Sequence, residues 1–231
     1  MQGETGSDLY FRQIPIGPMA NFAYLIGSKT TRTCLVVDPA WDVQTLLNLA
    51  HADEMTVTGA LVTHYHPDHV GGHMFGFDVP GGVAELLAHA KAKIHVHKHE
   101  ADGLKQVTGI SESDLVRHDG GDIVTVGDVS VELIHTPGHT PGSQCFLVRE
   151  RLVAGDTLFV NGCGRVDLPD SDPEAMFRTL SDTLAKLVDD VVLFPGHDYG
   201  PNPTSTMKEQ RRTNTYLRMK SLQDWMRLMG A

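Results

Sequence analysis

Seven histidine and aspartate side chains have types and spacings that suit metal binding. Residues 63–69 read Thr-His-Tyr-His-Pro-Asp-His, which places three imidazoles and one carboxylate within six consecutive positions. Three isolated candidate ligands follow downstream, namely His139, Asp156 and His197. Imidazole nitrogen and carboxylate oxygen bind borderline divalent metals such as zinc, manganese or iron. The sequence lacks the paired cysteines that would indicate a closed structural zinc site. The pattern therefore predicts a dinuclear metal centre with coordination positions open for chemistry.

The first metal is expected between three histidines. His64 and His66 lie two positions apart, so at the end of a strand both side chains point the same way and can hold one metal from one side. His139 lies in a turn rich in glycine and proline, and it would complete three protein ligands. The fourth position would remain open to water.

The second metal is expected between Asp68, His69 and His197, while the two carboxylate oxygens of Asp156 could bridge both metals. Two metals about 3.5 to 4 Å apart share one water, lower its pKa from about 15.7 toward about 7, and stabilise the oxyanion that develops on an acyl substrate. Asp68 could also orient the resulting hydroxide, which gives it an expected catalytic role.

The segments that must position these ligands alternate between strand and helix patterns. Short β-rich runs, bounded by Gly, Pro, Asp or Asn, predict strands, and apolar residues at helical spacing predict helices. The metal-binding stretch directly follows an apolar strand, where a rigid sheet can present a loop. Such alternation fits helices outside two facing sheets. The predicted strands are 9–16, 23–26, 33–37, 57–63, 93–97, 123–126, 129–135, 144–149, 151–154 and 191–194, and the predicted helices are 42–52, 83–91, 100–107, 172–188 and a long one from 205 to about 229.

Composition narrows the class of partner. A chain of 231 residues suits one large domain, or one domain with a small helical extension. Its formal charge of −10 argues against nucleic acid or an anionic membrane, which need a basic face, and favours a small molecule. The three scattered cysteines suit a reducing compartment, and no apolar run approaches the roughly 20 residues of a membrane span. We therefore expect a cytoplasmic protein.

The stretch His64 to His69 resembles the His-x-His-x-Asp-His signature of the metallo-β-lactamase superfamily, and His139, Asp156 and His197 match its further ligands. The resemblance covers nearly the whole chain. It implies an α+β fold, a four-layer αβ/βα sandwich, formed by residues 1–231 as a single domain with a short C-terminal helix at about 205–229. It also implies two divalent metal ions, with zinc expected and iron or manganese as alternatives.

Three glycine-containing segments are similar to the glyoxalase II branch, the hydroxyacylglutathione hydrolases: 155–159, 162–165 and 196–199. Members of that branch hydrolyse S-acylglutathione thioesters such as S-lactoylglutathione, so a glutathione thioester is the implied substrate. Only 34 residues follow His197, too few for the larger helical domain of classical glyoxalase II, so the short form of the family is the closer match.

Two alternative activities remain open. Residues 164–167 and 205–214 look as much like persulfide dioxygenases, relatives that oxidise glutathione persulfide with one Fe(II). Their ligands would here be His64, His139 and Asp156, a 2-His-1-carboxylate triad. A lactonase, or a hydrolase of another small ester, is the second alternative. The ligand set alone does not separate these activities.

Substrate contacts are expected from two arginines and a tyrosine. Glutathione is anionic, and the guanidinium of arginine binds carboxylates bidentately. Arg165 lies nine residues after Asp156 at a position that is basic in the family, and Arg211 resembles a family arginine, although a solvated helix face explains it equally well. Tyr199, two residues after His197, is expected to hydrogen-bond the substrate, with structural packing as its alternative role.

Other chemistry-bearing residues receive more ordinary interpretations. The alternating trio His95, His97 and His99 lacks a supporting carboxylate, so we do not expect a further metal site there. His73 and His135 are candidates to contact the metal ligands, and Cys163 is expected to be buried rather than reactive. The apolar loop 74–77 suggests a homodimer contact.

Overall fold

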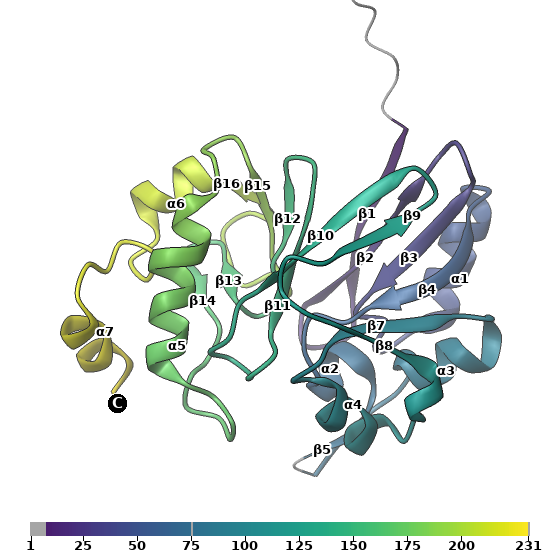
Figure 1. Cartoon of the computed structure of the whole chain (residues 1–231), viewed down its shortest axis with the longest axis horizontal. Helices are drawn as coiled ribbons and strands as arrows, with labels where there is room; N and C mark the ends of the chain where they lie inside the picture. Colours follow the sequence, from purple (N-terminus) through teal and green to yellow (C-terminus); the bar gives the residue numbers. More distant parts are fainter. Residues whose placement is uncertain (1–7, 75, 231) are drawn as a thin grey trace, which may run out of the picture.

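Two six-stranded β-sheets face each other in the computed structural model, which describes residues 8–74 and 76–230 (Figure 1). One sheet comes from the first half of the chain and the other from the second half. Helices cover the outer face of each sheet, so the layers follow the order helix, sheet, sheet, helix (Figure 1). The predicted four-layer α+β sandwich is therefore confirmed.

The first sheet has the order β1-β2-β3-β4-β7-β8. Its strands are β1 (Leu9–Ile16), β2 (Asn21–Ser28), β3 (Thr33–Val37), β4 (Thr56–Leu61), β7 (Lys93–His97) and β8 (Leu115–His118), and its helices are α1 (Val43–Ala52), α2 (Pro67–Val70), α3 (Gly82–His89) and α4 (Ala101–Thr108), followed by a 3-10 turn at Glu112–Asp114. Pairing is parallel from β3 to β4, β7 and β8. The carboxyl ends of β3, β4 and β7 therefore meet at one edge of the sheet.

The second sheet has the order β16-β15-β12-β11-β10-β9. Its strands are β9 (Ile123–Val126), β10 (Val129–His135), β11 (Gln144–Val148), β12 (Arg151–Val153), β15 (Val192–Phe194) and β16 (Ser205–Thr206), and its helices are α5 (Pro173–Arg178), α6 (Met207–Thr213) and α7 (Leu222–Met229). Strand β11 is antiparallel to β10 and β12, and β12 is parallel to β15. The ends of β10, β12 and β15 thus also share one edge.

Two small ribbons complete the strands. One pairs β5 (Gly72–Met74) with β6 (Phe77–Val79), and the other pairs β13 (Leu158–Phe159) with β14 (Gly162–Cys163). The predicted apolar loop at 74–77 is thus the tip of a hairpin, and its residue 75 lies outside the described residues.

Alternating side chains hold the layers together. On β10, Val131 and Leu133 belong to the apolar cluster between the sheets, together with Ile26 and Leu61 from the first sheet. The neighbouring Ile134 instead packs with the cluster under the helices of the second half. Burying each such side chain stabilises the fold by roughly 1.5–3 kcal/mol. Because successive side chains of a strand point to opposite faces, each sheet packs against the other sheet on one face and against its helices on the other.

Helix starts agree with the capping residues in the sequence. The side chain of Asp42 accepts a hydrogen bond from Thr45 N at the start of α1, and Asp172 caps α5 with Pro173 in its first turn. The predicted helix 172–188 is not uniform, because a π-helical turn at Thr179–Thr183 and a 3-10 turn at Leu184–Lys186 follow α5.

The prediction of one long helix from 205 to about 229 is wrong. Helix α6 ends at Thr213 and α7 begins at Leu222. Asn214 ends α6 because its buried side chain donates to Phe159 O and Gly162 O, 3.3 and 3.0 Å away, and accepts from Tyr216 N. The amphipathic pattern continued through this break, but tertiary hydrogen bonds outweighed it.

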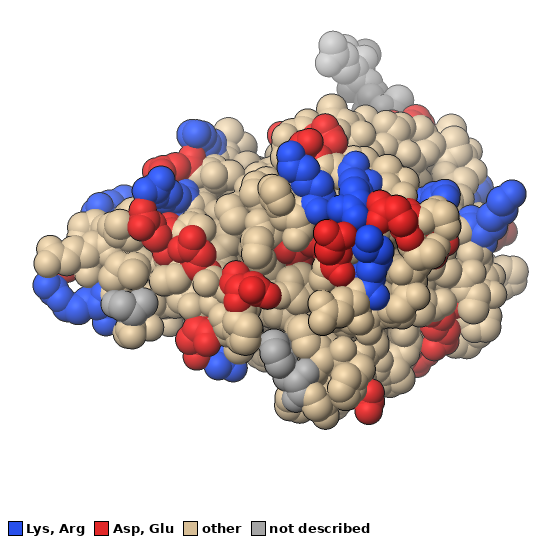
Figure 2. All heavy atoms as spheres, turned by 60° about the horizontal axis from the view of Figure 1, so that its bottom comes forward, with Lys and Arg blue, Asp and Glu red and all other residues tan. Residues whose placement is uncertain are grey.

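Charged side chains are mixed on the face shown in Figure 2, where Lys and Arg lie among Asp and Glu without forming a continuous basic area. Within the described residues, no helix combines the length and the apolar character needed to cross a membrane.

Candidate metal centre

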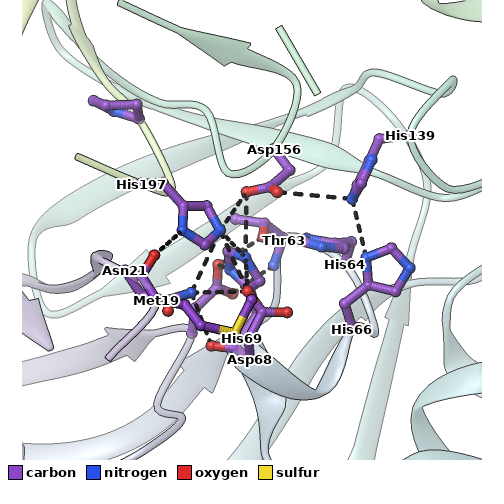
Figure 3. A network of polar contacts seen from close by, with 12 residues as sticks. Met19, Asn21, Thr63, His64, His66, Asp68, His69, His139, Asp156 and His197 are labelled. Carbon is purple, nitrogen blue, oxygen red and sulfur yellow. Dashed lines mark hydrogen bonds and ion pairs between the residues drawn. The ribbon is translucent and has the colours of Figure 1, made fainter. Parts of the chain in front are cut away.

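All seven predicted ligands converge at one edge of the sandwich (Figure 3). The segment with His64, His66, Asp68 and His69 follows β4 and continues into the single turn of α2. The other three lie in loops after β10, β12 and β15, and they are His139, Asp156 and His197. Because the carboxyl ends of these strands share an edge in each sheet, loops distant in sequence meet there.

His64, His66 and His139 form a three-sided cup. Their ring centroids lie 4.7, 4.7 and 4.8 Å apart, and each pair of rings is close to perpendicular. His139 Nε2 lies 3.0 Å from His66 Nδ1. All three side chains are buried, and one nitrogen of each lies within 4.8 Å of those of the others. This is the group expected to hold the first metal.

Asp68, His69 and His197 form the second group. His69 Nε2 lies 3.2 Å from His197 Nε2, and Asp68 Oδ2 lies 3.4 and 3.3 Å from these two nitrogens. Asp156 lies between the groups. Its Oδ1 is 3.2 Å from His69 Nε2 and its Oδ2 is 3.8 Å from His139 Nε2. One carboxylate oxygen therefore faces each group, which is the bridging arrangement expected from the sequence.

A buried polar atom without a hydrogen-bond partner supports a metal-binding role for this cluster. Among the described residues, His64 Nε2 is buried and lacks such a partner, and the buried Asp156 Oδ1 has the imidazoles of His69 and His197 as neighbours, at 3.2 and 3.4 Å. Buried polar atoms are nearly always hydrogen-bonded, so an orphan nitrogen in this cluster requires an explanation. A donor set of imidazole nitrogen and carboxylate oxygen matches zinc, iron or manganese. The residues present therefore fit two divalent metal ions.

Hydrogen bonds to Nδ1 turn four histidines toward the centre. His64 Nδ1 lies 3.1 Å from Thr63 Oγ1, and His69 Nδ1 lies 2.9 Å from Asp38 Oδ2. The Nδ1 atoms of the two distant histidines contact backbone carbonyls: His139 contacts Arg165 O at 2.8 Å, and His197 contacts Met19 O at 2.9 Å. Such bonds fix the ring orientation and leave Nε2 for the metal.

Sequence reasoning missed two residues that hold the second group. Asp38 is buried and accepts hydrogen bonds from Thr63 N and Thr63 Oγ1 as well as from His69. Asn21 donates from Nδ2 to Asp68 Oδ2 at 3.0 Å, and its own Oδ1 accepts from Trp41 Nε1. Asp38 could have been identified from the sequence, because it directly follows strand β3 just as the predicted ligands follow their strands. No sequence pattern distinguishes Asn21.

A third missed residue is Glu100, which joins the two loops of the first group. It follows β7 and is fully buried. Its Oε2 accepts from Tyr65 N at 2.8 Å, and its Oε1 accepts from Gly142 N at 2.6 Å. Burial raises its pKa to about 7, against the lowering effect of these hydrogen bonds. In the sequence, a carboxylate before a helix indicates only a cap.

Charge differs between the two groups. Burial and the neighbouring His139 lower the pKa of His66 to about 4, and burial also holds the pKa of His64 well below its usual range. In the second group, burial alone would lower the pKa of His197, but the nearby Asp156 carboxylate raises it to about 9. Burial would likewise raise the pKa of Asp68, yet His69 lowers it well below its usual value. His64 and His66 are thus neutral at pH 7, whereas Asp68 and His197 pair a carboxylate with an imidazolium.

The predicted substrate-binding residues lie in different surroundings. Tyr199 is 58% exposed and stacks on His197, with ring centroids 4.5 Å apart. Arg165 pairs through its side chain with Asp167 at 2.9 Å. Arg211 pairs with Asp189 and donates to the carbonyls of residues 185 and 187. The structure thus stacks the tyrosine on a ligand and engages both arginine side chains in ion pairs, with the backbone carbonyl of Arg165 against His139.

The remaining histidines and Cys163 have other partners. His95 contacts His118, with 2.9 Å between their nitrogens, and His97 stacks on His135 with centroids 4.0 Å apart. Within the described residues, the donor groups able to hold a metal do not include the trio at 95, 97 and 99. His73 pairs with Asp78 on the β5–β6 hairpin. Burial raises the pKa of the Cys163 thiol to about 12, so it stays protonated at neutral pH.

Comparison with protein families finds a match to the metallo-beta-lactamase superfamily over residues 16–197. Among curated relatives, the "Hydroxyacylglutathione hydrolase" of Polaromonas sp. is 31% identical over 87% of this chain and 82% of its own length. The human "Persulfide dioxygenase ETHE1, mitochondrial" is 26% identical over 99% of this chain and 84% of its own. The "Probable polyketide biosynthesis zinc-dependent hydrolase BaeB" of Bacillus velezensis is 27% identical over 87% and 83%.

Solved structures agree on the fold. ETHE1 from Myxococcus xanthus superimposes with a TM-score of 0.82 at 26% identity, covering 96% of this chain and 90% of that one. The protein TTHA1623 in a di-iron-bound form superimposes with a TM-score of 0.72 at 26% identity, covering 89% and 99%. Relatives named as a hydrolase and as a dioxygenase match this chain at similar identities, so the geometry of the site is the basis for choosing between these reactions.

Proposed function

The chain belongs to the metallo-beta-lactamase superfamily, a superfamily of metal-dependent enzymes, and from that premise we propose that it is a dinuclear metallo-hydrolase of thioesters, with glutathione thioesters as the first substrate class. The position of Asp156 carries this proposal. Its two oxygens face the two donor groups separately, at 3.2 Å from His69 Nε2 and 3.8 Å from His139 Nε2. A mononuclear centre would not need the complete second group.

Two bound divalent ions would supply a nucleophilic hydroxide at neutral pH and positive charge for the oxyanion of the acyl group. The residues of the chain supply position and hydrogen bonds. Asp68 stays ionised because of its low pKa, and Asn21 holds its Oδ2, so the carboxylate is placed to accept a proton from the attacking water. A tyrosine hydroxyl is protonated at neutral pH, so Tyr199, which stacks on His197, can donate to the substrate. The thiolate leaves with little need of a proton, because thiols ionise near pKa 8.5.

Persulfide dioxygenase activity is the second candidate, with His64, His139 and Asp156 as the triad for one iron. It is favoured by similarity to human ETHE1 over 99% of this chain. Hydrolysis of a lactone or another small ester is a further alternative on the same scaffold. Zinc is the proposed metal, with iron or manganese as alternatives.

Metal analysis followed by two parallel assays tests the proposal. We expect two metal ions per chain in natively purified protein, and hydrolysis of S-lactoylglutathione that stops on chelation and returns with added zinc. One iron per chain, together with oxygen uptake on glutathione persulfide and no thioester hydrolysis, would establish the dioxygenase instead.

Several finer predictions accompany this proposal. Substrate contacts by Arg165, Tyr199 and Arg211 are to be tested by the KM values of their variants. The homodimer contact at the hairpin tip is tested by the mass in solution. The cytoplasmic location predicted from composition also stays a prediction.

A further inference from the structure

An apolar groove opens beside the candidate metal centre. It has a volume of about 190 Å³, and two of the predicted ligands, His66 and Asp68, form part of its wall. Otherwise its lining is mainly apolar: Met19, Trp41, Met74, Phe77, Val79 and Leu168. A bound molecule in this groove would therefore have one end against the ligands and the rest among hydrocarbon side chains.

Five separate segments build the groove, and one of them carries His66 and Asp68. Met74, Phe77 and Val79 come from the β5–β6 hairpin, where Met74 and Phe77 are cross-strand partners. Met19 lies before β2 and Leu168 after β14. Trp41 is fastened to the site, because its Nε1 donates to Asn21 Oδ1 and to Asp68 O, both at 3.1 Å. The groove and the metal ligands are thus parts of one hydrogen-bonded assembly.

The groove exposes large apolar side chains to solvent, which is unfavourable unless a ligand covers them. Phe77 is 68% exposed and Met19 is 45% exposed, and both are among the few large apolar side chains at the described surface. Exposed apolar side chains that gather in one place usually mark a binding site.

Charge indicates what kind of group enters. No lysine or arginine lines the groove among the described residues, so it offers no cationic side chain to the carboxylates of glutathione. An uncharged hydrocarbon chain, in contrast, would gain from burial against its apolar lining.

We propose that this groove binds the uncharged aliphatic acyl chain of the substrate, with the acyl carbonyl at the His66 and Asp68 end. This inference rests on the proposed thioester hydrolysis and specifies its acyl half. Thioesters of medium-length fatty acids should therefore be hydrolysed more efficiently than those of small hydroxy acids such as lactate.

Chain length is the test. With glutathione as the constant thiol, the acetyl, butanoyl, hexanoyl and D-lactoyl thioesters are compared on the metal-loaded enzyme. Each added methylene should raise kcat/KM by up to about fourfold until the groove is full, the factor equivalent to about 0.8 kcal/mol. D-Lactoylglutathione should fall below the butanoyl compound.

Variants assign the effect to the groove. Phe77→Ala and Leu168→Ala should each lower the ratio of hexanoyl to acetyl kcat/KM several-fold. Ile123→Ala is the matched control, because Ile123 on β9 is 61% exposed and does not line the groove. It should leave the ratio unchanged.

A binding measurement separates this inference from the proposed reaction. S-hexylglutathione is not hydrolysed, and it should bind more tightly than S-methylglutathione, with Phe77→Ala removing most of the difference. Hydrolysis of every thioester at equal efficiency would overturn the acyl groove while leaving the hydrolase. Tight, Phe77-dependent hexyl binding without any thioester turnover would retain the groove and reject the reaction. A dimer that Phe77→Ala dissociates, with equal hexyl and methyl binding, would assign the groove to a second copy of the chain.

Discussion

Replacing Glu100 by glutamine should weaken metal binding by His64, His66 and His139 more than binding by the second group. Glu100 ties together the two loops that carry these three histidines. Its carboxylate accepts from Tyr65 N at 2.8 Å, between His64 and His66, and from Gly142 N at 2.6 Å, three residues after His139. Glutamine has the same shape but only one acceptor oxygen, so one of the two amides must lose its partner.

The expected magnitude follows from that single lost bond. A hydrogen bond to a charged group contributes about 1.5–3 kcal/mol, and tenfold in affinity corresponds to about 1.4 kcal/mol. If the freed loop has to be ordered when metal binds, the first group loses roughly 10- to 100-fold in affinity. The variant should still fold, because glutamine also removes a buried charge whose desolvation raises the pKa of Glu100 to about 7.

Competition with a chromogenic zinc chelator at pH 8 resolves the two binding steps. Glu112→Gln is the matched control, since Glu112 also receives hydrogen bonds from two partners, Lys105 and Arg117, but at the surface. Gly142→Ala offers a second route to the same defect, because a Cβ there would lie 2.8 Å from the Glu100 backbone nitrogen. Both Glu100→Gln and Gly142→Ala should weaken the first step.

Unchanged affinity in Glu100→Gln would refute the reasoning, and so would equal weakening of both steps. The first result would mean that the loops keep their positions without the carboxylate. The second would mean that Glu100 acts on general stability, which thermal unfolding of the metal-free protein would reveal separately.

Three further results are expected. The folded-state pKa of Glu100 is raised from 4.5 to about 7, so its stabilising contribution is complete below about pH 4.5 and is lost as the pH rises through 7. In urea titrations, the unfolding free energy of the metal-free wild type relative to Glu100→Gln should therefore fall by about 3 kcal/mol over that pH range. A difference that does not change with pH would contradict the raised pKa. Asp38→Asn should weaken metal binding by the second group 10- to 100-fold in chelator competition, because Asp38 Oδ2 contacts His69 directly; the first step should weaken less, because Asp38 reaches His64 only through Thr63 Oγ1. Arg211→Ala should lower Tm by a few degrees, since Arg211 holds Asp189 and two carbonyls, and an unchanged Tm would contradict this structural role; a raised KM for thioesters would support its predicted substrate contact.

Helix starts and tight turns could be predicted from the sequence because they depend on residues that are neighbours in the chain. The caps Asp42 and Asp172 start helices with their own side chains, and the Gly127-Asp128 turn joins β9 to β10. The C-terminal helix was misjudged at Asn214, where the decisive partners, Phe159 O and Gly162 O, lie more than 50 residues away. No pattern within the last 27 residues records those bonds.

The sequence by itself determined the donor set and its division into two groups, because ligand type and spacing are local and the strand-end positions were visible. Only the tertiary structure decided what orients those donors. Asp38, Asn21 and Glu100 reach the centre from the ends of other strands, and their carboxylates and amide act through hydrogen bonds across the sandwich. The apolar groove likewise arises where five separate segments meet. Such contacts depend on how whole strands align, and that alignment is set by packing over the entire core.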